Sequence, residues 1–109
     1  MPDVQNKKGP ITSALAGDPY MRELVQQFVE ALPKRASQMQ DHLAARDIEA
    51  LARLAHQLKG SAGGYGFSTI TDEAARLEQI AKTSKDLEEL EKRVREIADM
   101  CHRASAQAD

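Results

Sequence analysis

His56 is the residue best suited to chemistry in this sequence, because a lysine follows it three positions later and a run of glycines comes next. A neutral imidazole is a nucleophile near neutral pH, since its ordinary pKa is about 6.5. Attack of such a ring on phosphorus gives a phosphohistidine. Lys59, one helical turn along, can place positive charge beside the phosphoryl oxygens. These two residues could therefore carry out phosphoryl transfer, but their spacing alone is not specific to it.

Gly60, Gly63 and Gly64 lie in the same helical stretch as His56, although glycine inside a helix costs about 0.5–1 kcal/mol relative to alanine. Stability does not explain them. Without them, a surface histidine with no role would be the simpler interpretation. Together they predict a surface stripped of side chains, where another protein can approach the imidazole closely.

Four helices are predicted to position these residues, because apolar side chains recur at three-, four- and seven-residue spacings and no alternating β pattern is present. Short connections favour an all-α fold, an antiparallel up-down four-helix bundle. A short extra helical turn is expected at 11–17, and Pro33 is expected to kink the first helix or divide it into two. The expected helices run from Asp18-Pro19 to about Ala45, from Asp47 to Gly66, from Ser68 or Thr71 to Lys82, and from Lys85 to about Ala106.

The same periodicity predicts which side chains face the core and turns His56 about 130° away from it, toward solvent. Asp18, Asp47 and Asp86 are predicted N-caps, and Gly66 is predicted to end its helix in a left-handed conformation. The charged run at 85–95 is expected to be the solvated side of the last helix. The predicted core positions are Leu24, Phe28, Leu32, Met39, Leu43, Ile48, Leu51, Ala55, Leu58, Ala62, Ile70, Ala74, Leu77, Ala81, Leu87, Leu90, Val94, Ile97 and Cys101.

Bulk composition limits the classes of function. The 109 residues suit one domain, predicted over 11–109 after a flexible polar arm at 1–10. A net charge of −2 gives little support for nucleic-acid binding, and no apolar run approaches the roughly 20 residues that span a bilayer. The arm lacks the apolar stretch of a signal peptide, so a cytoplasmic location is expected. The spacing of the histidines argues against a bound metal, and His42 and His102 are expected to be ordinary surface residues.

The motif around His56 extends beyond the histidine and the lysine. It reads Ala55-His56-Gln57-Leu58-Lys59-Gly60-Ser61-Ala62, with Gly63, Gly66 and Phe67 after it and Leu77-Glu78 on the next helix. This pattern strongly resembles the histidine-containing phosphotransfer (HPt) domains of two-component phosphorelays, and the resemblance covers most of the chain. It implies a monomeric four-helix bundle in which His56 accepts a phosphoryl group from one receiver-domain aspartate and passes it to another. It also implies that Glu78 holds Nδ1 of the imidazole and leaves Nε2 free.

The resemblance further implies a phosphocarrier that works without ATP, with receiver domains of response regulators or of a hybrid sensor kinase as partners. No cofactor is expected on this chain, and Mg²⁺ is expected only on the partner receiver domain. The alternative is a docking adaptor that is never phosphorylated, but such an adaptor would need neither His56 nor Lys59. The expected docking surface comprises Ala52, Arg53, Gln57, Gly60, Gly63, Gly64 and Phe67.

Overall fold

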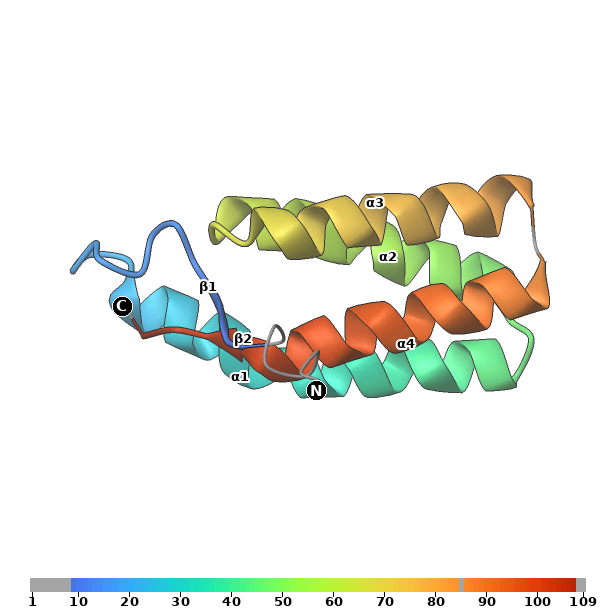
Figure 1. Ribbon diagram of the computed structural model, residues 1–109, viewed down its shortest axis with the longest axis horizontal. Helices are drawn as coiled ribbons and strands as arrows, with labels where there is room; N and C mark the ends of the chain where they lie inside the picture. Colours follow the sequence, from blue (N-terminus) through green and yellow to red (C-terminus); the bar gives the residue numbers. More distant parts are fainter. Residues whose placement is uncertain (1–8, 85, 108–109) are drawn as a thin grey trace, which may run out of the picture.

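The computed structural model describes residues 9–84 and 86–107, and in them four helices form an antiparallel bundle (Figure 1). The predicted all-α four-helix bundle is confirmed. Helix α2 packs extensively on α3, while α1 packs on α4, so the two pairs form two layers. Two short strands, β1 and β2, pair in parallel beside the bundle. The elements are β1 (Ile11–Thr12), α1 (Arg22–Ala44), α2 (Ile48–Gly64), α3 (Ser68–Thr83), α4 (Leu87–Arg103) and β2 (Ala104–Ser105).

Local capping signals explain where several helices begin and end. The Asp47 carboxylate accepts a hydrogen bond from the Ala50 backbone N–H at 3.1 Å, and the Asp86 carboxylate accepts from the N–H groups of Glu88 and Glu89. Gly66 has a φ of +84°, and a Cβ there would lie 2.6 Å from the Ser13 hydroxyl. The predicted N-caps Asp47 and Asp86 and the left-handed glycine are confirmed.

The segment before α1 differs from the prediction. Instead of a helical turn over all of 11–17, β1 pairs with β2, placing Ile11 opposite Ala104, and hydrogen-bonded turns follow. The partner strand lies more than 90 residues away, so no local pattern could indicate it. Helix α1 also begins later, at Arg22, because the Asp18 carboxylate accepts from Tyr20 N–H in a separate turn. The predicted N-cap at Asp18 is therefore wrong, and Met21 takes this position without a side-chain cap.

Other parts of the chain's path also bear on the predictions. Helix α1 runs unbroken through Pro33, so two helices in series are excluded, while a kink at this residue stays a prediction. Helix α4 ends at Arg103 rather than near Ala106. The predicted flexible arm at 1–10 lies mostly outside the described residues, as does the predicted helix start at Lys85. Of the arm, Gly9 has a backbone carbonyl that accepts from Arg103 Nη1 at 3.0 Å.

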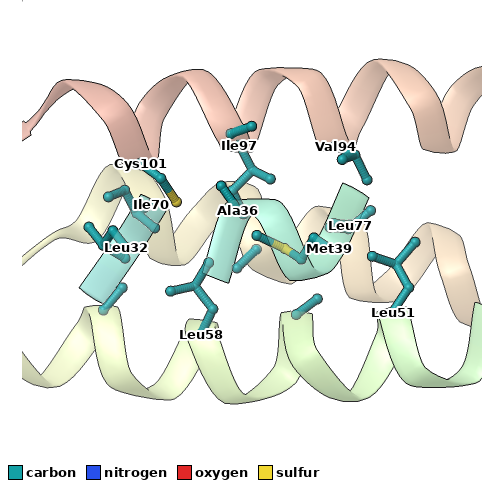
Figure 2. Packing of buried hydrophobic residues seen from close by; sticks show 14 of the residues in the cluster. Leu32, Ala36, Met39, Leu51, Leu58, Ile70, Leu77, Val94, Ile97 and Cys101 are labelled. Atoms are coloured by element: carbon teal, nitrogen blue, oxygen red, sulfur yellow. The ribbon is translucent and has the colours of Figure 1, made fainter. Parts of the chain in front are cut away.

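The core is aliphatic and is built by all four helices, with Leu32 and Met39 packing among Leu58, Leu77 and Ile97 (Figure 2). Most predicted core positions are buried, but Leu24 and Leu87 are 44% and 39% exposed. Val25 takes the place predicted for Leu24, because it lies three residues before Phe28 and is fully buried. Ile48 is only half-buried. The predicted core thiol Cys101 is buried, and that burial raises its pKa to about 12.

The charged run of α4 is not wholly solvated, contrary to the prediction. Arg93 is buried, and its Nη1 lies 2.8 Å from Oε2 of Glu73 on α3. Its Nε lies 3.6 Å from Glu89 on α4 itself. This pair links α3 to α4, and losing either partner would leave an uncompensated buried charge. No helix within the described residues is both long and apolar enough to cross a membrane.

Candidate functional site

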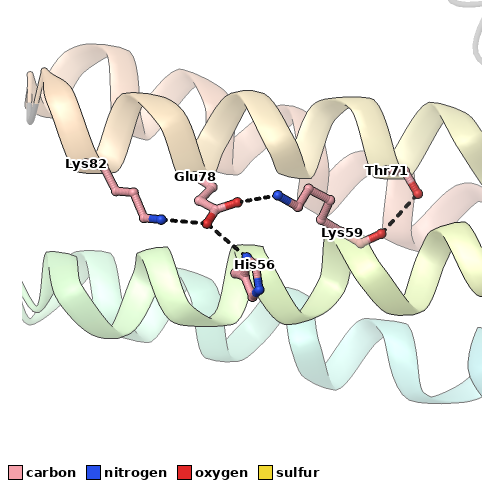
Figure 3. A network of polar contacts seen from close by, with 5 residues as sticks. All are labelled: His56, Lys59, Thr71, Glu78 and Lys82. Atoms are coloured by element: carbon pink, nitrogen blue, oxygen red, sulfur yellow. Dashed lines mark hydrogen bonds and ion pairs between the residues drawn. The ribbon is translucent and has the colours of Figure 1, made fainter.

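His56 projects from the outer face of α2, and 64% of its side chain is exposed. Its Nδ1 lies 3.0 Å from Oε2 of Glu78 on α3 (Figure 3). The predicted contact between these two residues is confirmed. It arises because α2 and α3 are antiparallel neighbours, so residues 22 positions apart in the chain face one another.

Glu78 is the centre of the site, because three basic side chains surround its carboxylate. Lys59 Nζ lies 2.9 Å from Oε1, and Lys82 Nζ lies 2.9 Å from Oε2. The two lysines reach the carboxylate from opposite sides, with His56 below it in the view of Figure 3. Hydrogen bonds from Lys82, then Lys59 and His56, lower the Glu78 pKa to about 2, although the burial of this side chain acts in the opposite direction.

The low pKa of Glu78 fixes the tautomer of the imidazole. An ionised carboxylate only accepts hydrogen bonds, so Nδ1 of His56 must be the donor. In a neutral ring, the proton on Nδ1 leaves Nε2 with a free lone pair. The geometry therefore presents one defined nucleophilic nitrogen.

Lys82 was not singled out from the sequence. A signal was present, because Glu78 and Lys82 stand four residues apart on one helix, and such pairs face each other. The sequence alone did not show that the Glu78 side chain is buried, so this pair looked like an ordinary surface pair. The backbone of Lys59 also contacts α3, since its carbonyl accepts a hydrogen bond from the Thr71 hydroxyl at 3.3 Å.

The glycines beside His56 leave open space. A Cβ at Gly60 or Gly64 would meet nothing within 4 Å, and one at Gly63 would make an ordinary contact of 3.4 Å with Thr71. No close approach within the described residues requires glycine at these three positions. The surface toward the carboxyl end of α2 is therefore bare for a reason other than internal packing.

Two predicted docking residues are less accessible than expected. Phe67 is fully buried, with its ring centre 5.8 Å from that of Phe28, so the prediction that it contacts a partner is wrong. The Phe67 ring packs in the hydrophobic core because the ring is large and apolar. Ala52 is 8% exposed rather than part of an open stripe. Arg53 and Gln57 are exposed as predicted.

Two grooves flank the exposed ridge of α2, and Gln57 lines both. The α3-side groove, of about 600 Å³, is lined by Glu49, Ala52, Arg53, His56, Gln57, Glu78 and Lys82. The α1-side groove, of about 270 Å³, is lined by Ala31, Lys34, Arg35, Gln38, Leu54 and Gln57. The imidazole thus stands at the border of a recess that already contains two carboxylates and two cations.

The described residues contain no group of three or more histidine, cysteine, aspartate or glutamate side chains placed to hold a metal ion. His42 is half-buried and His102 is exposed.

Comparison with known families gives one result. The family model described as Hpt domain matches residues 23–107, which is most of the chain. No curated protein and no solved structure matched the chain.

Proposed function

The chain belongs to the Hpt domain family, and from this premise we propose that it carries a phosphoryl group on Nε2 of His56 between the aspartates of two receiver domains. One observation supports this proposal above the others. The ionised Glu78 carboxylate engages Nδ1 and leaves the second ring nitrogen of an exposed histidine free.

The transfer step follows from that arrangement. The Nε2 lone pair attacks the phosphorus of an aspartyl phosphate and forms an N–P bond. The P–O bond breaks, and its electron pair leaves on the aspartate carboxylate. The ring becomes a phosphorylated imidazolium whose Nδ1–H still donates to Glu78, so no proton has to move. The reverse sequence passes the group to another receiver aspartate.

Glu78 assists this step by stabilising positive charge as it develops on the ring. A carboxylate held within hydrogen-bond distance of an imidazole orients it and favours its cationic form. Glu78 is already ionised at neutral pH, so the stabilising charge is in place before the reaction begins.

Lys59 and Lys82 are placed to offset the negative charge that the phosphoryl group brings. Both are bound to one carboxylate, so two positive charges face a single negative one. A phosphoryl group adds close to two negative charges near neutral pH. We infer that the lysines shift part of their interaction from Glu78 to the phosphoryl oxygens after transfer.

Labelling with a charged receiver tests the proposal. A receiver domain carrying radiolabelled phosphate, prepared with labelled acetyl phosphate, is mixed with the wild type and with His56→Gln. We expect label on the wild type and none on the variant. Label that persists on His56→Gln excludes the phosphocarrier role. A wild type that binds receivers but is never labelled by any of them is instead a docking adaptor.

A further inference from the structure

We propose that the α1-side groove recognises the receiver domain by binding an acidic segment of it. This inference rests on the proposed function, because it concerns the partner that exchanges phosphoryl groups with His56. It assigns recognition to residues of α1, a helix that contributes nothing to the contacts around the imidazole.

Position makes the groove part of any docking surface centred on His56. Gln57 follows His56 directly in α2 and lines both grooves. A stable protein interface covers about 800 Å² on each partner, far more than one side chain. A domain that brings an aspartate to Nε2 therefore also covers Gln57 and extends over the adjoining groove.

Charge defines what the groove can bind. Two of its six lining residues, Lys34 and Arg35, are cationic and none is acidic. Within the described residues neither cation makes an ion pair. Glu30 lies one turn before Lys34, but it is not part of the lining, and its carboxylate accepts a hydrogen bond from the Gln26 side chain at 2.8 Å. Unpaired cations favour a partner surface that carries carboxylates.

The remaining lining residues indicate which side chains the partner segment carries. Ala31 and Leu54 add aliphatic surface, and Gln38 adds an amide that can donate to a carboxylate. The guanidinium of Arg35 lies 5.9 Å from the centre of the Phe28 ring, which restrains its orientation. The groove therefore fits a segment in which carboxylates alternate with small apolar side chains, rather than a uniformly charged one.

The α3-side groove does not provide the same selectivity. Its lining pairs two carboxylates, Glu49 and Glu78, with two cations, Arg53 and Lys82. Its charges are therefore balanced before a partner arrives. Selectivity for an acidic partner is therefore provided by the α1-side groove.

Two pairs of matched variants test the proposal. Gln38→Glu and Lys34→Glu place negative charge in the groove. Gln40→Glu, on the same helix, and Lys92→Glu, on α4, make the same charge changes at exposed positions outside both grooves. The probe is the receiver domain from the source genome that binds the wild type most tightly. Its association rate, affinity and transfer rate are measured at about 20 mM and about 500 mM salt, because the Debye length falls from tens of ångströms to a few over such a range.

We expect Gln38→Glu and Lys34→Glu to slow association roughly three- to tenfold at low salt and much less at high salt. The two control variants should stay close to the wild type. The hydrolysis rate of phosphohistidine should be unchanged in all four variants, since none of these residues contacts the imidazole.

Equal effects of the groove variants and their controls would overturn the proposal. So would self-association of the wild type that Lys34→Glu abolishes without changing receiver binding, because the groove would then bind a second copy of the chain. Binding to the receiver is measured separately from labelling. Binding that depends on the groove, without label on His56, supports the docking site and counts only against phosphoryl transfer.

Discussion

The two sides of α2 differ in how their charges are arranged. On the α3 side, a carboxylate with only 8% of its side chain exposed is held by His56, Lys59 and Lys82. On the α1 side, Lys34 and Arg35 line a groove that contains no acid. The first arrangement fixes one ring and one proton, whereas the second leaves charge available for a partner. We infer that reactivity and recognition occupy opposite sides of one helix.

Replacing Glu78 should give the largest change in the transfer rate, because it removes the carboxylate that His56, Lys59 and Lys82 all contact. We expect Glu78→Ala to slow phosphoryl transfer to His56 about 10- to 100-fold, the range typical of groups that orient a functional histidine. Receiver affinity should change little. Single-turnover transfer and equilibrium binding, measured on the same protein, check both statements. An equal loss in receiver affinity would contradict the assignment of reactivity to the α3 side of α2 and recognition to its α1 side.

Lys82 tests whether the α3 side needs both of its lysines. Since each lysine offsets part of the incoming negative charge, we expect Lys82→Ala to lower the transfer rate about three- to tenfold and to shorten the lifetime of the phosphohistidine. Lys82→Arg should restore most of the activity, because it keeps the charge. Lys92→Ala, on α4, serves as the control. Wild-type behaviour in Lys82→Ala would leave Lys59 as the relevant cation.

Replacing Gly60 should change stability and docking in opposite directions. The open space around it accommodates a methyl group, so Gly60→Ala should raise the free energy of unfolding by about 0.5–1 kcal/mol. The same methyl group occupies the bare surface beyond His56 and should slow transfer from the receiver by a few fold. Thermal or urea unfolding, combined with transfer kinetics, measures both effects.

Gly66→Ala provides the opposite case for comparison with Gly60→Ala. This variant should be less stable than the wild type, because Gly66 has a φ of +84° and a Cβ there would lie 2.6 Å from the Ser13 hydroxyl. A Gly60→Ala variant that is both less stable and fully active would contradict the functional interpretation of the glycine.

The dependence of stability on pH tests the charge of Glu78 directly. The Glu78 pKa is lowered from 4.5 to about 2, so the folded state holds the charged form more strongly than the unfolded state does. Its contribution is complete above pH 4.5 and is lost as pH falls toward about 2. Glu78→Gln should therefore show a shallower loss of stability than the wild type in this interval. Urea unfolding at several pH values measures the difference, and identical slopes would mean that the carboxylate is not specifically stabilised.

Local patterns predicted most of the bundle. The aliphatic spacing of α3, with Ile70 and Leu77 inside, and the caps at Asp47 and Asp86 depend only on nearby residues, so they could be identified directly. The failures have two causes. Leu24 shows that a pattern can be shifted by one residue at the end of a helix, where few neighbours fix its phase. The β1–β2 pairing depends on residues from opposite ends of the described chain.

The candidate site was predictable in its chemistry but not in its electrostatics. His56 and Lys59 stand out by spacing, and Glu78 was expected from the family resemblance. Lys82 was missed, although its spacing from Glu78 fits a helical pair, because many exposed pairs share that spacing without forming a site. Phe67 was misassigned because its position in the motif says nothing about which way its ring turns.

By itself, the sequence determined the helical periods, the caps, the nucleophile and the glycines that clear its surroundings, since each is a property of residues close together in the chain. Only the tertiary structure decided which charges meet. It placed Glu78 among His56, Lys59 and Lys82, and it paired Glu73 with Arg93 on the other side of the same helix. Two carboxylates five residues apart on α3 acquire different roles because the bundle turns one toward α2 and the other toward α4. That choice depends on packing across the whole domain.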